Sequence, residues 1–317
     1  MTTSRTLPAP IRRVPRAGAA VTLALLAALG AACGGTGAAR PTTTSAPVSG
    51  PEAGVTSRYG SDVGSPSTPT TGAAQAASHA YTAQVQASAA AFVASVTALQ
   101  GDVARDDGPS ARVDELAAQG HYDALRVLES GNSINASTLD ELDSDVLPGQ
   151  SFGGLHAVER DLWVGGPLAA DVAALVGQAP VAQFLLSRER LGPEAIGLTA
   201  VDQLDWVIDT ALPHSQEHAS HLGLVDVADT VAAARQAFGD IQPLSDMVDP
   251  TLTTAVAGQF ATLATAIAAL GPPTTTPDTS VSPTARLALS QDLDATATTL
   301  ARLTAELTPY GTAGAPS

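Results

Sequence analysis

The sequence predicts an all-α protein built from antiparallel helical bundles. Apolar residues recur at spacings of three and four from about residue 77 onward, and no segment alternates like a strand over more than a few residues. Gly and Pro divide the chain into stretches of helical length. Hydrophobic residues make up 44% of the chain and aromatic residues only 3%, so Ala, Leu and Val must form most of the core. These residue types suit closely packed helices.

The first 32 residues are expected to be a lipoprotein signal peptide. Arg12, Arg13 and Arg16 precede the apolar run AAVTLALLAALGAA, which is too short for a comfortable transmembrane helix. The run ends at Cys33, and the preceding Leu-Gly-Ala-Ala resembles a bacterial lipobox. The resemblance implies that Cys33 is lipid-modified and anchors the protein to the outer face of the cytoplasmic membrane. The alternatives are an ordinary signal peptide with an incidental cysteine and a twin-arginine export signal.

The remaining chain is expected to contain a tether and one helical domain. Residues 33–76 are rich in Gly, Thr, Ser, Pro and Ala, and this composition cannot bury enough surface to fold. The helical domain is expected at 77–308 and a disordered tail at 309–317. Cys33 is the only cysteine, so a metal site in the domain must use His, Asp and Glu. The net charge of −16 excludes nucleic acid as a partner, because phosphate binding needs basic patches.

About eight helices are expected. Tyr81, Val85, Ala89, Phe92 and Val96 share one face of the first helix. The other helices are predicted at about 110–130, 150–164, 168–190, 194–212, 223–239, 247–270 and 284–307. The breaks are predicted at Gly131, Pro148, Gly165-Gly166, Gly192-Pro193, Pro213, Pro243, Pro250 and the segment GPPTTTP at 271–277.

The stretch GLHAVERDLW at 154–163 places a carboxylate on the apolar face of a helix. On a helical wheel with Leu155 at 0°, the apolar arc runs from about 300° to about 80°, and Glu159 lies at about 40°. His156 lies at the edge of the arc, whereas Ala157, Arg160 and Asp161 take the opposite side. A buried carboxylate needs a partner, because burying an unpaired charge is costly. His156 and Glu159 could bind one cation together, or Glu159 could form a core ion pair with an arginine such as Arg126.

The same stretch resembles the GxHxxExxLW signature of the imelysin family, in particular the lipid-anchored component of Efe-type ferrous-iron uptake systems. The segments GPEAIGLTAVDQLDWV (192–207) and SHLGLVDVADTVAAARQAF (220–238) are also similar to family segments. The likeness covers about 80–308. It implies two four-helix bundles and a metal site around His156 and Glu159 with further carboxylates. It also implies a membrane iron permease and a secreted peroxidase-like protein as partners.

The chain departs from the family pattern next to this site. The segment HYDALRVLESGNSI lacks the second Glu of the family run, and Glu129 matches only after a one-residue shift. The acidic loop that follows reads LDELDSD, in which Asp143 is the first choice of ligand and Asp140 and Asp145 are alternatives. The resemblance thus implies a metal set of His156, Glu159, Glu129 and Asp143. The cupredoxin-like domain that some relatives carry before the helical domain has no counterpart here.

Two other groups of residues are candidates for a function. His214, Glu217, His218 and His221 are expected on one face of a short helix, and HSQEH matches an H-x-x-E-H zinc-peptidase pattern. A secondary surface metal site or a solvated loop end would explain the same residues. The last group, Asp202, Asp205 and Asp209, is either a solvated acidic face or the wall of a cleft.

The sequence therefore favours an extracytoplasmic metal-binding lipoprotein that supports cation uptake and is not an enzyme. Iron is the expected metal, and zinc, manganese and copper also suit imidazole and carboxylate ligands. The first alternative is a zinc-dependent peptidase of the imelysin type, which would use the HSQEH histidines. The second is an envelope scaffold that binds no metal.

Overall fold

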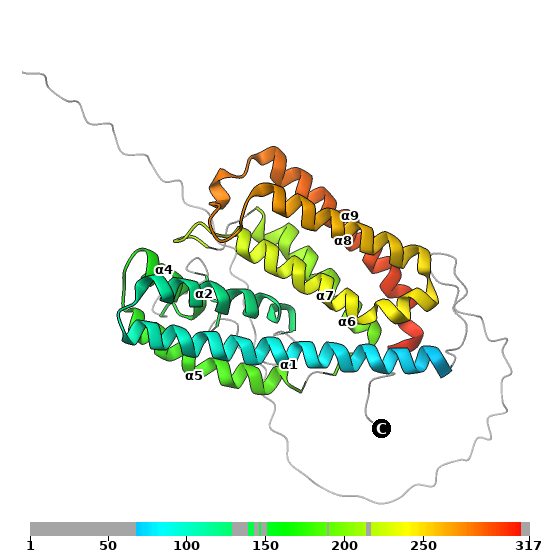
Figure 1. Ribbon diagram of the computed structural model, residues 1–317, viewed down its shortest axis with the longest axis horizontal. Coiled ribbons are helices and arrows are strands. Elements are labelled where there is room, and N and C mark those ends of the chain that lie inside the picture. Colours follow the sequence, from blue (N-terminus) through cyan, green and yellow to red (C-terminus); the bar gives the residue numbers. More distant parts are fainter. Residues whose placement is uncertain are drawn as a thin grey trace, which may run out of the picture. The chain divides into compact units, whose positions relative to one another are not determined.

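The computed structural model describes residues 68–128, 139–142, 146, 151–188, 190–213 and 217–311. These residues are mostly α-helical and contain no β-strand, which confirms the all-α class over this part of the chain (Figure 1). The α-helices are α1 (Thr68–Ala104), α2 (Gly108–Asp123), α4 (Gly154–Trp163), α5 (Leu168–Leu186), α6 (Pro193–Trp206), α7 (Leu224–Val248), α8 (Pro250–Leu270) and α9 (Pro283–Glu306). Shorter elements are η1 (Arg126–Leu128), the π-helical turn η4 (Val207–Ala211), η5 (Asp278–Ser280) and η6 (Thr308–Tyr310).

Most helices lie near where the sequence places them, with larger differences at α1, α2 and α7. The helix expected at about 110–130 ends at Asp123 and is followed by the short element η1. Helix α1 begins at Thr68, before the boundary expected at residue 77, and the added stretch is rich in alanine, the strongest helix former. Helix α7 continues to Val248 although Pro243 lies inside it. Ile241 and Leu244 on either side of this proline are fully buried. Their packing against the core outweighs the hydrogen bond that the proline cannot make.

Side-chain caps fix the starts of three helices. Asp249 accepts hydrogen bonds from the amides of Thr251 and Leu252 before α8, and Pro250 occupies the first helical position. Ser282 caps α9 in the same way, and Asp107 caps α2. Each cap satisfies amides that have no partner within their own helix, so the segments before these helices end at defined residues.

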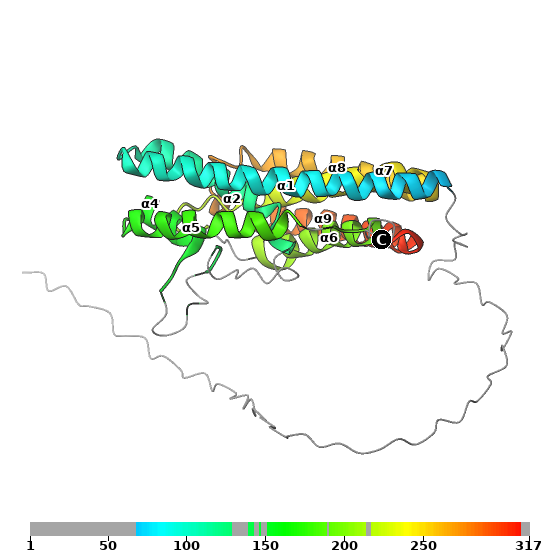
Figure 2. The same ribbon diagram turned by 90° about the horizontal axis from the view of Figure 1, so that it is seen from below.

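The buried side chains form two hydrophobic clusters that share α1. The first half of α1, with Tyr81 and Val85, packs into a cluster with α6, α7, α8 and α9. Its second half, with Phe92, Val96 and Leu99, packs into a cluster with α2, α4 and α5. Figures 1 and 2 show α1 running beside α2 and α5 over one part of its length and beside α6 and α7 over the other.

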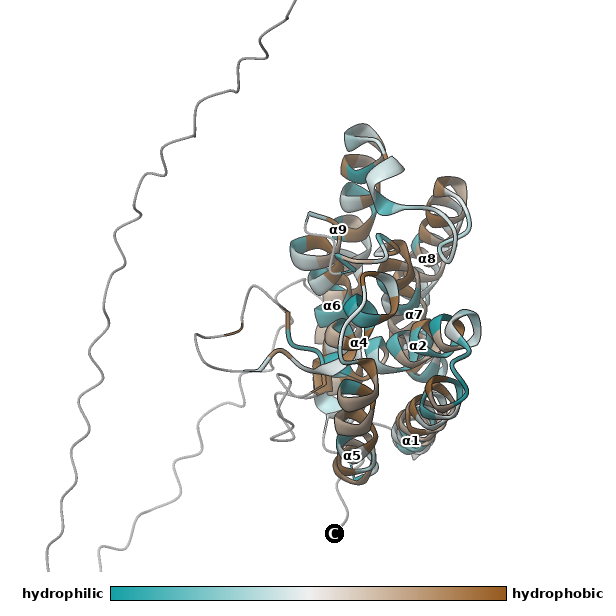
Figure 3. Cartoon of the chain, turned by 90° about the vertical axis from the view of Figure 1, so that its left-hand side faces the viewer, coloured by the Kyte–Doolittle hydropathy of each residue, from teal (hydrophilic) through white to brown (hydrophobic). Residues whose placement is uncertain are grey.

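Three of the described helical segments are long and apolar enough to cross a membrane by length and composition alone, namely Thr70–Ala104, Leu168–Leu186 and Pro250–Leu270. Each nevertheless contributes side chains to one or both of the hydrophobic clusters. In Figure 3 the residues of α5 are largely hydrophobic, whereas those of α2 are more hydrophilic. The hydrophilic character of α2 matters for the site, because two of its acids are fully buried.

Candidate metal site

A glycine with a positive φ angle sets the start of α4. Gly154 has φ of 78°, a backbone conformation that L-residues rarely adopt. A Cβ at this position would lie 2.5 Å from the carbonyl carbon of Leu139. The next amide, of Leu155, donates a hydrogen bond to the Leu139 carbonyl at 2.7 Å. This close approach ties the first turn of α4 to the chain before it.

Helix α4 is enclosed on almost all sides. Glu159 is 1% exposed and His156 is 3% exposed, so the inward position predicted for Glu159 is confirmed. Ala157 and Asp161, expected on the outer side, are buried as well. That expectation is wrong because α4 packs against α2 and α5 and also contacts the segment before α7.

The partners of Glu159 are two backbone amides. Its Oε1 accepts hydrogen bonds from the amide of Ala219 at 2.9 Å and from the amide of Ser220 at 2.6 Å. The guanidinium of Arg126, considered as a partner from the sequence, instead pairs with Asp123 and Asp140. Glu159 therefore joins α4 to the segment 217–223 without a side-chain cation.

The segment 217–223 is a turn and not a helix. The amide of His221 donates to the carbonyl of Glu217 at 3.0 Å, and the amide of Asp278 donates to the carbonyl of His221 at 2.9 Å. The prediction of a short helix around HSQEH is thus wrong over the described residues 217–223. The amides of Ala219 and Ser220 bond to Glu159 of α4 and not to carbonyls of their own segment. The turn directs Glu217 into the interior, where it is fully buried, and leaves His218 exposed.

The turn brings Glu217 to the His156–Glu159 pair. Nδ1 of His156 lies 3.5 Å from Oε1 of Glu217. One ligand atom each from His156, Glu159 and Glu217 lies within 4.8 Å of the other two, and all three residues are buried. The sequence placed Glu217 in a separate constellation, as the base of a peptidase pattern. No local signal assigns it to α4, because its contact with His156 spans 61 residues of chain.

Further buried carboxylates surround this triad of His156, Glu159 and Glu217. Glu115 and Asp123 of α2 and Asp226 of α7 are all 0% exposed. Neither carboxylate oxygen of Glu115 or of Asp226 has a hydrogen-bond partner among the described residues. Arg126 is the basic side chain that pairs with this group, through Asp123 and Asp140. This group of buried acids therefore holds more carboxylates than the guanidinium of Arg126 can neutralise.

Burial and mutual repulsion raise the pKa of three of these acids. The pKa of Glu217 lies well above its ordinary value of 4.5 because of burial first, and then because of the nearby Asp226, Glu115 and Glu159. Burial likewise raises the pKa of Glu115 and the pKa of Asp226 well above their ordinary values. Without a cation, the cluster thus reduces its charge by retaining protons.

His156 is neutral at physiological pH. Burial, followed by the nearby charge of Arg126, lowers the pKa of the imidazole from 6.5 to about 4. Its Nε2 lies 3.1 Å from Oδ1 of Asp140, but the two atoms are not aligned as a hydrogen bond. A neutral imidazole with available nitrogens is the form that binds transition metals.

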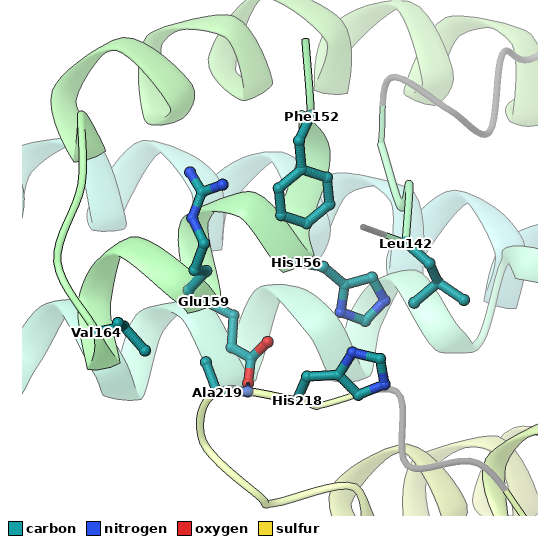
Figure 4. A pocket seen from close by; sticks show the side chains of 8 residues that line it. Leu142, Phe152, His156, Glu159, Val164, His218 and Ala219 are labelled. Carbon is teal, nitrogen blue, oxygen red and sulfur yellow. Dashed lines mark hydrogen bonds between the residues drawn. The ribbon is translucent and has the colours of Figure 1, made fainter. Parts of the chain in front are cut away.

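A cavity of about 190 Å³ adjoins the triad, and His156 and Glu159 form part of its wall. Figure 4 shows His218 and Ala219 on one side of this cavity and Phe152 and Leu142 on others. The side chains of Leu142, Phe152 and Val164 make the remaining wall largely apolar. The cavity gives small solutes a route to the triad.

The structure describes some of the other residues predicted for a site and not others. Glu129, Asp143, Asp145, His214 and Cys33 lie outside the described residues. Asp140, an alternative to Asp143, does lie beside His156. The acids of α6 and η4, namely Asp202, Asp205 and Asp209, are exposed, as expected for a solvated acidic face.

Comparison with known proteins adds no assignment. No protein-family model matches the chain, and no curated protein matches it significantly. The proposal of a metal site therefore rests on the geometry of the buried triad and its surrounding acids.

Proposed function

We propose that this protein binds a metal cation through His156, Glu159 and Glu217. The observation that carries the proposal is the convergence of a neutral imidazole and two carboxylates within 4.8 Å in a buried position. Nitrogen and carboxylate donors of this kind suit Fe, Zn, Mn and Cu. Calcium and magnesium are less suitable, because they prefer all-oxygen sets.

The surrounding acids favour a bound cation over an empty interior. Glu115 and Asp226 are fully buried and their oxygens have no hydrogen-bond partner among the described residues. A divalent ion near them would offset the repulsion that now raises their pKa values. The excess of buried acid is thus stabilising with a cation present and destabilising without one.

The wider role in this proposal is metal uptake, with iron as the expected cargo. Its support is the resemblance of residues 154–163 to the imelysin signature, in which His156 and Glu159 are the metal-binding pair. In this proposal the helices form two four-helix bundles and Cys33 carries a lipid anchor. The protein delivers the ion to a membrane permease and has a peroxidase-like partner. No catalytic nucleophile enters the proposal.

A structural role for Glu159 is the second candidate. Its Oε1 already accepts two backbone amides, and these bonds alone would fix the turn at 217–223 against α4. On this view the protein is an envelope scaffold and the triad binds nothing. The two candidates differ in whether removing charge at the triad changes metal affinity or only stability.

The test is a metal titration of the purified, metal-stripped full chain with Fe²⁺, Zn²⁺, Mn²⁺ and Cu²⁺, monitored by calorimetry. Wild-type protein is expected to bind about one equivalent through these ligands. The variants His156→Ala, Glu159→Gln and Glu217→Gln should each lose at least tenfold in affinity, since even indirect partners of metal ligands contribute about 10–100-fold.

The substitution Glu159→Gln is informative because glutamine keeps an oxygen that can accept both amides while it removes the charge. The double variant Asp202→Asn, Asp205→Asn is the control, because it removes two exposed acids and should bind like wild type. Equal affinity in wild type and Glu159→Gln, with a change only in melting temperature, would favour the scaffold.

A further inference from the structure

This inference rests on the proposed function and concerns the side of the triad that faces the cavity. The triad supplies one nitrogen and two carboxylate donors. Zinc sites are almost always four-coordinate, and other first-row metals take four to six ligands. At least one coordination position is therefore left for a further donor.

The cavity wall limits which side chain can supply that donor. Leu142, Phe152 and Val164 carry no ligand atom, and Ala219 uses its amide to bind Glu159. Arg160 also lines the cavity but is cationic, and its guanidinium is held by Asp161 at 2.7 Å and lies over the ring of Phe152. Among the described residues of the wall, His218 is the one besides His156 and Glu159 with an available metal-binding atom.

The backbone around His218 is fixed relative to the triad. Glu217 precedes it and belongs to the triad, while Ala219 and Ser220 follow it and donate their amides to Glu159. In Figure 4 the imidazole of His218 lies at the cavity beside that of His156. Only its side chain is free to change position, because the residue is exposed.

We propose that His218 is the entry ligand of the site, that is, a fourth ligand that lies at the cavity and binds the cation as it enters. In the structure His218 stands outside the 4.8 Å group of three, so its side chain turns inward to complete the coordination. Exposed side chains change rotamer in picoseconds to nanoseconds, and such a turn does not limit the rate of binding. The completed set has two imidazole nitrogens and two carboxylates.

A second imidazole changes which cations bind best. Imidazole suits Zn²⁺, Cu²⁺ and Fe²⁺, whereas Mn²⁺ is better matched by oxygen donors. His218 thus makes the site selective for the former ions over Mn²⁺. The carboxylates of the triad bind either class, so they set affinity more than selectivity.

The test compares His218→Asn with His221→Asn in the full chain. Both substitutions remove an exposed imidazole from the same turn, and asparagine tolerates the positive φ of 61° at residue 221. His218→Asn should weaken Zn²⁺ binding about tenfold or more and Mn²⁺ binding much less, while His221→Asn leaves both unchanged.

Electron paramagnetic resonance of the protein loaded with one equivalent of Cu²⁺ counts the nitrogen ligands directly. We expect two imidazole nitrogens in wild type and one in His218→Asn. Unchanged zinc affinity and an unchanged spectrum in His218→Asn would overturn the proposal that His218 is the entry ligand. The metal site itself would still stand if Glu159→Gln loses binding in the same assay, so the two proposals fail separately.

Discussion

At the scale of single residues, Glu159 shows how a carboxylate is kept inside this protein. Two backbone amides from a turn 60 residues away solvate one of its oxygens. Two backbone N–H donors satisfy this buried oxygen without a basic side chain. The carboxylate is thus held in place beside His156 and Glu217.

Glu115 lacks such partners, and this predicts an unusual pH dependence. Burial raises its pKa well above 4.5, with Glu159 and Asp123 adding to the shift. Between the unfolded and folded pKa values the folded state holds a proton that the unfolded state has released. The contribution of Glu115 to stability therefore decreases as the pH rises above about 4.5.

Replacement of Glu115 by Gln removes this proton dependence. The metal-free Glu115→Gln variant should melt at a higher temperature than wild type at pH 8, because its folding requires neither proton uptake nor burial of a charge at residue 115. At pH 4 the two proteins should melt within a degree or so of each other, since Glu115 is then largely protonated in both states. Thermal unfolding followed by circular dichroism at both pH values is the measurement, and a lower melting temperature for the variant at pH 8 would contradict the prediction.

Residue burial could be predicted from the sequence only where a helix period reports it. The wheel through 154–163 places Glu159 inside, and it is inside. The same wheel places Asp161 outside, and it is buried, because a wheel cannot show that α4 is covered on several sides. Glu217 and Asp226 come to the site through tertiary contacts that carry no local pattern.

At the scale of elements, α4 depends on the way the chain enters it. Gly154 combines a positive φ with a close approach to Leu139. Its neighbour Gly153 has an extended backbone, with φ of −144°, and open space where a Cβ would lie. Two adjacent glycines thus have different structural requirements, although the sequence does not distinguish them.

This difference predicts the outcome of two matched substitutions. Gly154→Ala should destabilise the protein by about 1–2 kcal/mol from the left-handed backbone alone, with a further cost from the clash at Leu139. Gly153→Ala should be close to neutral. Chemical denaturation of both variants checks this, and equal stabilities would show that the start of α4 can relax.

The positions of the helices are the part of the fold that the sequence predicts best. Helical spacing and the Pro and Gly residues place α5, α6, α8 and α9 close to their observed ranges. In contrast, Pro243 predicts a break within α7 and the helix continues. Burial of Ile241 and Leu244 decides that case, and burial is a tertiary property.

At the scale of the whole described domain, the two hydrophobic clusters are parts of one folding unit because α1 contributes to both. The sequence predicts the helices but not this sharing, because the periodicity of α1 is the same along its length. Melting of one cluster would release the half of α1 that packs in it, and the half that packs in the other cluster would lose its helical continuation.

A substitution that creates a cavity in one cluster should therefore lower the stability of both clusters. Leu99 is fully buried in the second half of α1, and Leu99→Ala should cost about 2–5 kcal/mol. We expect one cooperative transition in calorimetry, shifted to lower temperature. Val113→Ala on the exposed surface of α2 is the control and should leave the transition in place. Two separate transitions in Leu99→Ala would show that the clusters unfold independently.

The 37 residues of α1 also restrict how the protein can admit an ion. A straight α-helix of this length extends about 55 Å and is rigid along its axis. Closure of the two hydrophobic clusters around an ion would need a hinge between them, and such a hinge would have to bend α1 in its middle. Loading and unloading of the ion are therefore expected without a large change in radius of gyration, so the rate of exchange is governed at the mouth of the cavity.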